Sequence, residues 1–150
     1  MARAVLTLAL LTLASLPAAA GEPHEAGATF ALIIGNNTSI DSDLEPLRYA
    51  DDDAARYFEL FRMLGARTYM LTRPDENTRR LHPQAVAESR VPRYDVLNEV
   101  MQQIKKDIQT AHDQEVSTTF YFIYAGHGNH ENGRGYITRE FGRMTGERMF

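Results

Sequence analysis

The continuous apolar run from Thr29 to Gly35 (TFALIIG) constrains the fold more than any other segment. Its residues do not alternate between apolar and polar, as they would in a strand with one face in water. The run is therefore expected to be a strand buried on both faces, as in a parallel sheet covered by helices. Asn36 and Asn37, which follow directly, are expected to form the turn after this strand. The sequence thus predicts an α/β fold.

Two further segments complete a strand, helix, strand order. From Arg48 to Leu64, apolar residues recur at helical spacing, and Gly65 is expected to be the C-cap of this helix. The segment from Arg67 to Thr72 is short and rich in β-forming residues. Short connections between such elements are typical of a βαβ unit with a right-handed crossover.

The second half of the chain is expected to add a loop, a helix and a strand. Three prolines between Arg73 and Arg93 predict a long surface loop, either functional or mobile. Asp95 is expected to cap a helix that runs to about Ala111. Thr118 to Ala125 (TTFYFIYA) is the strongest strand segment, and it leads into the turn-rich stretch GHGNHENGRG. Tyr136 to Phe150 is expected to hold a short hairpin strand and the start of a helix.

Residues 1–20 have the features of a signal peptide. Arg3 supplies a positive charge, Ala4 to Leu16 form an apolar stretch, and small residues precede a cleavage site expected after Ala20. The stretch is shorter than the roughly 20 residues that span a bilayer, so export to the periplasm or medium is expected, without stable membrane insertion. An uncleaved N-terminal anchor is the alternative. Residues 21–28 are expected to be a flexible leader, and residues 29–150 the folded domain.

The composition excludes several classes of function. The chain is 43% hydrophobic and 24% charged, which is typical of a globular domain. A net charge of −4 offers no basic surface for phosphates, so no nucleic-acid partner is expected. The sequence has no cysteine, so these 150 residues contain neither a disulfide nor a thiol nucleophile.

His127 is the main candidate functional residue. It lies between Gly126 and Gly128, directly after the strongest strand segment. Its imidazole is expected at the rim of the sheet, where the glycines allow tight backbone turns and close approach of a substrate. Because imidazole titrates near neutral pH, His127 could act as a general base and acid in acyl transfer. A purely structural histidine in a turn explains the same three residues.

Four segments, FALIIGNN, LRYADDDA, FRMLGA and FYFIYAGHG, resemble caspase-like cysteine peptidases in their order and spacing, especially the bacterial branch near metacaspases. The resemblance covers roughly Phe30 to Tyr136. It implies the caspase-hemoglobinase fold, a mostly parallel sheet with helices on both faces. It also implies hydrolysis of peptide bonds by a Cys-His dyad.

The resemblance assigns roles to three residues. His127 matches the histidine of the dyad, and Gly128 matches the residue whose N–H forms part of the oxyanion hole. Asp53 matches an aspartate that lines the pocket for a substrate residue before the scissile bond, where a carboxylate would favour Arg or Lys. The expected partner is therefore a peptide or protein substrate. A solvated start of a helix is the alternative explanation for the acidic run from Asp51 to Asp53.

The sequence departs from the caspase pattern at its end. The nucleophile of caspase-type enzymes is expected roughly 50 residues after the histidine, whereas 23 residues follow His127 here. We therefore expect a truncated catalytic domain, with the sheet incomplete at its C-terminus and no hydrolysis by the 150 residues alone. A non-catalytic binding module or pseudoenzyme is the alternative.

Two other sites are weighed and not favoured. His127, His130 and Glu131 could suggest a zinc site, but zinc-hydrolase histidines are spaced on a helix and this segment is rich in glycine. Ile34 to Asn37 could suggest a phosphate loop, but neither glycine-rich nucleotide motif is present. We expect no metal and no cofactor.

Overall fold

The computed structural model describes residues 27–38, 44–131, 134–139 and 142–145, and it has an α/β fold. The predicted signal peptide and almost all of the predicted leader lie outside the described residues, as does Phe150. Side chains after Gly128 are not described. None of the helices in the described ranges combines the length and the apolar character needed to cross a bilayer.

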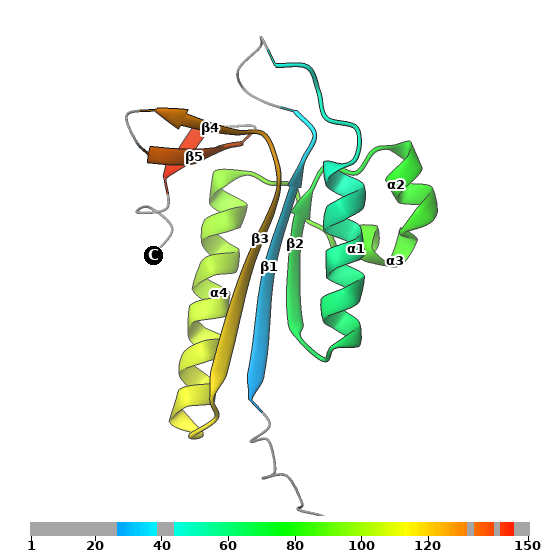
Figure 1. The fold of residues 1–150 in the computed structure, drawn as a ribbon. Coiled ribbons are helices and arrows are strands. Elements are labelled where there is room, and N and C mark those ends of the chain that lie inside the picture. The colour runs from blue at the N-terminus through cyan, green and yellow to red at the C-terminus, as the bar shows by residue number, and fades with distance from the viewer. Residues whose placement is uncertain (1–26, 39–43, 132–133, 140–141, 146–150) are drawn as a thin grey trace, which may run out of the picture.

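Three parallel strands form the central sheet: β1 (Ala28–Asn36), β2 (Arg67–Thr72) and β3 (Thr118–Gly126). Their order is β2-β1-β3, so β1 lies in the middle (Figure 1). In the register, Gly35 pairs with Thr72 and Asn36 pairs with Gly126. All three strands therefore end at the same edge of the sheet, which we call the carboxyl rim. The three strands predicted from the sequence are confirmed, each within one residue at either end.

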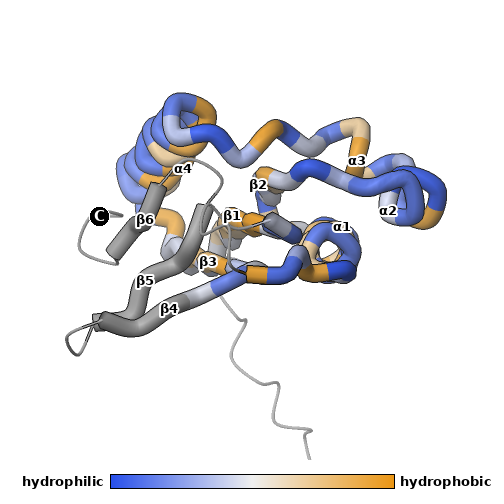
Figure 2. The backbone as a smooth tube through the Cα atoms, turned by 90° about the horizontal axis from the view of Figure 1, so that it is seen from above, coloured by the Kyte–Doolittle hydropathy of each residue, from blue (hydrophilic) through white to orange (hydrophobic). Residues whose placement is uncertain are grey.

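Helices cover both faces of this sheet. Figure 2 shows α1 (Ala50–Met63) and α4 (Tyr94–Asp113) on opposite sides of the strands. Alternate residues of β1 point to the two sides, because successive side chains of a strand face opposite ways. Ala31 and Ile33 pack in the cluster with α1, whereas Leu32 and Ile34 pack in the cluster with α4. Burial of each large aliphatic side chain contributes about 1.5–3 kcal/mol, which explains the unbroken apolar run.

The ends of the two long helices differ in how well the sequence predicted them. Gly65 has a φ of +78° and ends α1, with its N–H donating to the carbonyl of Arg62 and the N–H of Ala66 donating to Phe61. In this Schellman arrangement Leu64 is the C-cap residue and Gly65 follows it at C′, so the glycine ends the helix as predicted, one position beyond the cap itself. The prediction that Asp95 caps α4 is wrong. Arg93 is the N-cap residue, and Asp95 lies in the first turn, where its carboxylate pairs with the Arg93 guanidinium.

The segment predicted as a long loop contains two short helices, α2 (Glu76–Leu81) and α3 (Pro83–Glu88). Local capping explains the difference. The Asp75 side chain accepts a hydrogen bond from the Thr78 N–H, which starts α2, and Pro83 occupies the first turn of α3. After α3, Arg90 forms a parallel bridge with Leu71 on the outer edge of β2.

A second, antiparallel sheet follows the central one. It consists of β4 (Gly128–Glu131), β5 (Arg134–Arg139) and β6 (Gly142–Thr145), in that order. The predicted hairpin strand is confirmed. The predicted start of a helix is wrong for Gly142–Thr145, which is a strand paired with β5. Pairing with β5 gives these backbone groups hydrogen-bond partners, whereas a single helical turn is marginal by itself.

Candidate functional site at the carboxyl rim

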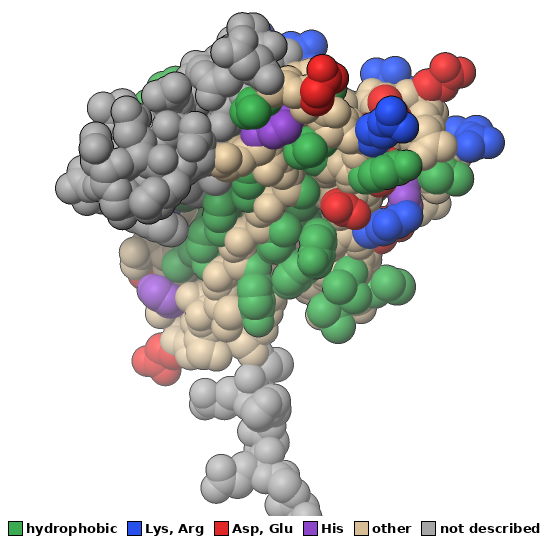
Figure 3. All heavy atoms as spheres, turned by 45° about the horizontal axis from the view of Figure 1, so that its top comes forward, with side chains coloured by type: hydrophobic (Ala, Val, Ile, Leu, Met, Phe, Trp, Pro, Cys, Tyr) green, Lys and Arg blue, Asp and Glu red, His purple; other side chains and the backbone are tan. Residues whose placement is uncertain are grey.

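Unsatisfied polar atoms concentrate at the carboxyl rim. Among the described side chains, five buried nitrogen or oxygen atoms have no hydrogen-bond partner, and four of them lie at or beside this rim. They belong to Asn36 at the end of β1, Thr72 at the end of β2, Asp52 in the first turn of α1, and His127 directly after β3. Buried polar groups are normally hydrogen-bonded, so this concentration marks a candidate site. Figure 3, with the top of Figure 1 turned forward, shows histidine, acidic and apolar side chains at this end.

His127 lies between β3 and β4, as the sequence predicted for a histidine at the rim. Its side chain is half-buried, and its Nε2 atom is fully buried with no hydrogen-bond partner in the described chain. The backbone at this point is held differently. The hydroxyl of Tyr124 donates a hydrogen bond of 2.9 Å to the carbonyl oxygen of His127. The backbone of His127 is therefore held in place, while the Nε2 atom of its imidazole makes no hydrogen bond within the described chain.

Gly126 is required for space and not for a left-handed turn. Its φ lies outside the positive range, and it is the last residue of β3. A Cβ atom at Gly126 would lie 2.5 Å from the Tyr124 hydroxyl oxygen and 2.7 Å from Cζ of the same ring. The Tyr124 ring therefore occupies the space that a side chain at residue 126 would need.

The three aspartates of α1 take different positions. Asp51 and Asp52 are buried, whereas Asp53 is exposed. The alternative of a solvated helix start is therefore wrong for Asp51 and Asp52, and only Asp53 of the three is exposed to solvent. Asp52 accepts only a long hydrogen bond of 3.4 Å from Asn77, and its Oδ2 atom has no partner in the described part of the chain.

Asp51 is the centre of a buried polar network on the β2 side of the rim. Its carboxylate accepts hydrogen bonds from the side chain of Asn37 (2.6 Å), the N–H of Asp75 (2.7 Å) and the hydroxyl of Thr78 (2.8 Å). Burial opposes its charge, but these hydrogen bonds outweigh that effect and hold the pKa of Asp51 below its ordinary value. The carboxylate joins the end of β1, the start of α1 and the start of α2.

Asn37 is a structural residue that the sequence analysis missed. Its Oδ1 atom accepts a hydrogen bond of 2.8 Å from the N–H of Ala50, the first residue of α1. Tyr49, the N-cap residue of α1, provides no side-chain cap, so Asn37 satisfies this end of the helix from 13 positions away. The Asn-Asn pair after the first strand was the available signal, but its partner could not be known before the fold brought it close.

Asp53 lies in the first turns of α1, on an exposed part of the helix. Asp53, Tyr57 and Leu60 follow one another at helical spacing, and with Arg56 they line a pocket of about 280 Å³. Further along α1, Phe61 contacts Tyr121 of β3 with ring centroids 5.0 Å apart. The Asp53 carboxylate also has a cation within reach, because the Arg56 guanidinium lies 3.7 Å away. Both side chains are at least half exposed, so this ion pair is weak.

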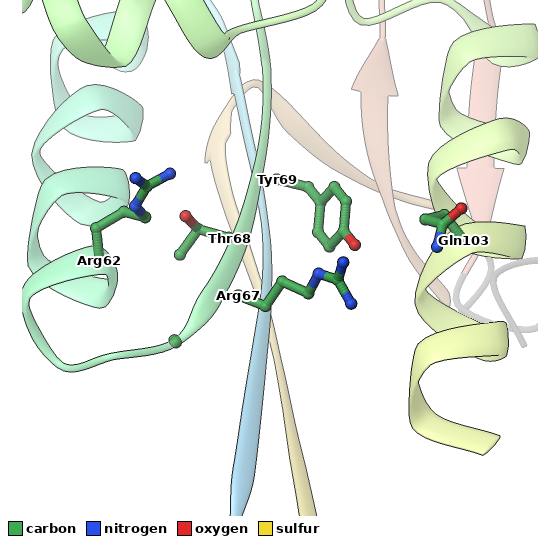
Figure 4. A pocket seen from close by; sticks show the side chains of 6 residues that line it. Arg62, Arg67, Thr68, Tyr69 and Gln103 are labelled. Carbon is green, nitrogen blue, oxygen red and sulfur yellow. The ribbon is translucent and has the colours of Figure 1, made fainter. Parts of the chain in front are cut away.

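A larger hollow of about 460 Å³ lies along the outer edge of β2 (Figure 4). It is lined by the first residues of this strand, whereas the rim lies at its last residue. Arg67 and Tyr69 point toward α4, where the Arg67 guanidinium and the Tyr69 hydroxyl both contact the carboxylate of Asp107 at 2.8 Å. Burial and this hydrogen bond raise the pKa of Tyr69 to about 12. The guanidinium and phenol groups that line the hollow already have partners, and the hollow lies at the amino-terminal half of β2. Ligands of open α/β sheets bind at the opposite end.

No metal site is found within the part of the chain whose side chains are described, where no three His, Asp or Glu side chains are gathered. The side chains of His130 and Glu131, weighed above with His127 as zinc ligands, lie outside the described side chains. The predicted absence of a metal at this position stays a prediction.

The sequence profile of the caspase domain family, Peptidase C14, matches residues 28–146. The chain belongs to this family. The match covers the central sheet, both long helices and the second sheet, so the caspase domain fold predicted from the sequence is confirmed. Membership indicates a cysteine-peptidase-like function and peptide or protein substrates. No curated protein and no solved structure matched the chain.

Within the caspase domain, the predicted site residues fall at the two sides of one rim. His127 and Gly128 follow β3, and Asp53 lies near the start of α1, which begins at the same rim. β3 is the last strand of the described sheet, and its outer edge has no neighbouring strand in the described ranges. Next to Asp51, the start of α2 contacts the rim through the Asp75 N–H and the Thr78 hydroxyl.

Proposed function

We propose that this caspase domain contributes the histidine half of a cysteine-peptidase active site, with His127 as general base and acid. The observation that carries the proposal is the Nε2 atom of His127, which is buried at the rim without a partner in the described chain. A structural histidine would normally satisfy a buried ring nitrogen. An imidazole held at the carboxyl end of a parallel strand is suited to proton transfer near neutral pH.

The chemistry needs a thiol from outside these 150 residues, which contain no cysteine. His127 would take the thiol proton, and the thiolate would attack the carbonyl carbon of the scissile bond. The N–H of Gly128 would donate to the oxyanion that forms. His127 would then return the proton to the leaving amine, and water would hydrolyse the thioester. A strand paired with the open edge of β3 would bring its own carboxyl end beside His127.

Asp53 is proposed to bind a basic substrate residue before the scissile bond. Its carboxylate is exposed and lies beside the side chains of Tyr57 and Leu60, near the start of α1. A substrate Arg or Lys would replace Arg56 as its partner, and the exposure of that ion pair makes the exchange inexpensive in free energy.

Export is part of the proposal. The apolar N-terminal stretch and the small residues before Ala20 support cleavage there and action outside the cytoplasm.

The test uses the continuous reading frame through and beyond Phe150, expressed without residues 1–20. If that frame encodes a cysteine, the protein is expected to hydrolyse fluorogenic peptides with Arg or Lys before the reporter. His127→Ala should lower kcat/KM by at least about 10³-fold, because the thiol loses its base. His112→Ala is the control, since His112 lies at the far end of α4. Retained activity in His127→Ala would refute the proposal.

A non-catalytic binding module is the second candidate, and the absence of cysteine favours it. A stop codon directly after Phe150, together with no hydrolysis by the mature protein, would contradict the peptidase proposal and support this alternative.

A further inference from the structure

Tyr124 connects the core of the domain to the backbone of His127. Its side chain packs against the apolar cluster that β1 and α4 form with Leu71. Its hydroxyl reaches the carbonyl oxygen of His127, three residues further along the chain, at 2.9 Å. Because the ring is held by packing, the hydroxyl is a rigid donor and not a mobile surface group.

The carbonyl that Tyr124 binds belongs to the same peptide group as the N–H of Gly128. The peptide group is planar, and in the trans form its C=O and N–H point in opposite directions. No peptide bond in the described chain is cis. A hydrogen bond that fixes the His127 carbonyl therefore also fixes the direction of the Gly128 N–H. Accepting this bond also polarises the peptide group, which makes the N–H a stronger donor.

The Gly128 N–H is not needed by the second sheet. Glu131 pairs with Arg134 across two intervening residues, and Gly128 pairs with Ile137 three positions further along the hairpin. Antiparallel pairs alternate between hydrogen-bonded and non-hydrogen-bonded. Because the pair that flanks a two-residue loop is hydrogen-bonded, the Gly128 pair is of the other kind. Its N–H points away from β5, and the residue is exposed.

Gly126 makes this arrangement possible. Any side chain at residue 126 would collide with the Tyr124 ring, because its Cβ would lie 2.5 Å from the hydroxyl oxygen. The tyrosine hydroxyl, the glycine beside it and the His127–Gly128 peptide thus form one unit.

We propose that Tyr124 is a positioning residue whose hydroxyl orients and polarises the His127–Gly128 peptide, so that the Gly128 N–H is aimed at the oxyanion of the substrate. The effect on catalysis rests on the proposed function, because it requires a substrate oxyanion next to Gly128. The structural half of the inference, the coupling from the Tyr124 hydroxyl to the Gly128 N–H, is independent of any reaction and can be measured on the chain itself.

The first experiment compares Tyr124→Phe with the unchanged mature chain by NMR. The variant loses only the hydroxyl, so the fold should persist. The carbonyl carbon of His127 is expected to move upfield, the amide nitrogen of Gly128 to shift with it, and amide exchange at Gly128 to change. Tyr121→Phe is the matched control, because Tyr121 is on the same strand and its ring contacts Phe61 on the other side of the sheet. Shifts at His127 and Gly128 no larger than those in Tyr121→Phe would overturn the inference.

The second experiment measures kinetics in the cysteine-containing protein described under Proposed function. Tyr124→Phe is expected to lower kcat on the order of tenfold with KM unchanged, less than the factor of about 10²–10³ for removing a whole oxyanion donor. The midpoints of the pH profile should not move, because the hydroxyl binds backbone and not imidazole. A loss of activity in His127→Ala with unchanged kcat in Tyr124→Phe would overturn this inference alone. Activity in His127→Ala would instead overturn the proposed function.

Discussion

Two buried polar groups at the carboxyl rim, the Asp51 carboxylate and the His127 imidazole, differ in their hydrogen bonding. On the β2 side, the buried carboxylate of Asp51 accepts hydrogen bonds from three donors in two segments, one directly after β1 and two at the start of α2. On the β3 side, the buried Nε2 atom of His127 has no partner in the described chain, and the Tyr124 hydroxyl holds only its backbone. Satisfied groups stabilise a fold, whereas a buried group left unsatisfied is available to a ligand. The Asp51 network is therefore structural, and His127 is the residue that we propose for the chemistry. The contrast applies to these two residues, since Asp52 and Thr72 on the β2 side also have buried oxygen atoms without a partner among the described side chains.

The largest expected effect breaks the β2 side. Asp51→Ala removes the acceptor for three hydrogen bonds and leaves the buried hydroxyl of Thr78 and the partly buried side-chain amide of Asn37 without their partner. The free energy of unfolding should fall by about 3 kcal/mol, measured by urea denaturation of the mature chain. Asp53→Ala is the matched control, because its exposed carboxylate should contribute less than about 0.5 kcal/mol. Equal losses in both variants would contradict the contrast between the two carboxylates.

The same network has a signature in pH. The pKa of Asp51 is lower in the folded chain than its ordinary value of 3.8, so its contribution is fully present above pH 3.8. It is lost as the pH falls below that value toward the folded pKa. Asp51→Asn cannot ionise, so its stability should depend less steeply on pH in this range. An unchanged slope between the variant and the parent would show that other carboxylates dominate acid unfolding.

The next effect concerns the contact between α1 and the end of β1. A Cβ at Gly35 would lie 2.5 Å from the carbonyl oxygen of Ala50 and 2.6 Å from Cβ of Ala54, so the helix must move. Gly35→Ala should cost about 2 kcal/mol of stability. Gly126→Ala meets the far end of one side chain, that of Tyr124, and no backbone atom, so it should cost less than moving a helix while disturbing the His127 peptide. The reverse order of the two costs, measured by thermal unfolding, would contradict this assignment.

A smaller effect is expected at the far end of the sheet. Tyr69→Phe removes the hydrogen bond to Asp107 and should cost about 1 kcal/mol. Because the pKa of Tyr69 is raised from 10.0 to about 12, its contribution is present below pH 10 and is lost as the pH rises through about 12. Stability measured from pH 8 to pH 11 should therefore decline less in the variant. A parallel decline would exclude Tyr69 as the cause.

The smallest stability effect is expected for the residue with the largest effect on activity. His127→Ala removes no side-chain hydrogen bond within the described chain and should change the free energy of unfolding by less than about 1 kcal/mol. His82→Ala is the matched control, since His82 Nδ1 lies 3.0 Å from the Glu59 carboxylate. A larger loss in His127→Ala than in His82→Ala would make His127 structural and would weaken the contrast between the two sides of the rim.

Local sequence signals predicted the elements whose cause is local. The apolar run of β1, the helical spacing of α1 and α4, and the glycine after α1 each leave a pattern within a few residues. The place of His127 at the end of β3 followed from such patterns, whereas the caspase domain was predicted from the resemblance of four segments to that family. The short helices α2 and α3 were missed, although Asp75 and Pro83 were local signals for them, because three prolines were taken as evidence against regular structure.

Only the tertiary structure separated residues that look alike in the sequence. Three consecutive aspartates have the same local context, yet helical rotation of about 100° per residue buries Asp51 and Asp52 and exposes Asp53. Asn37 is adjacent to a strand in the sequence, but its partners are 13 and 14 positions away. The sequence placed an imidazole at the rim through the strand before it. Which polar groups at that rim have partners depends on contacts between distant segments, and those exist only once the sheet and its helices have packed together.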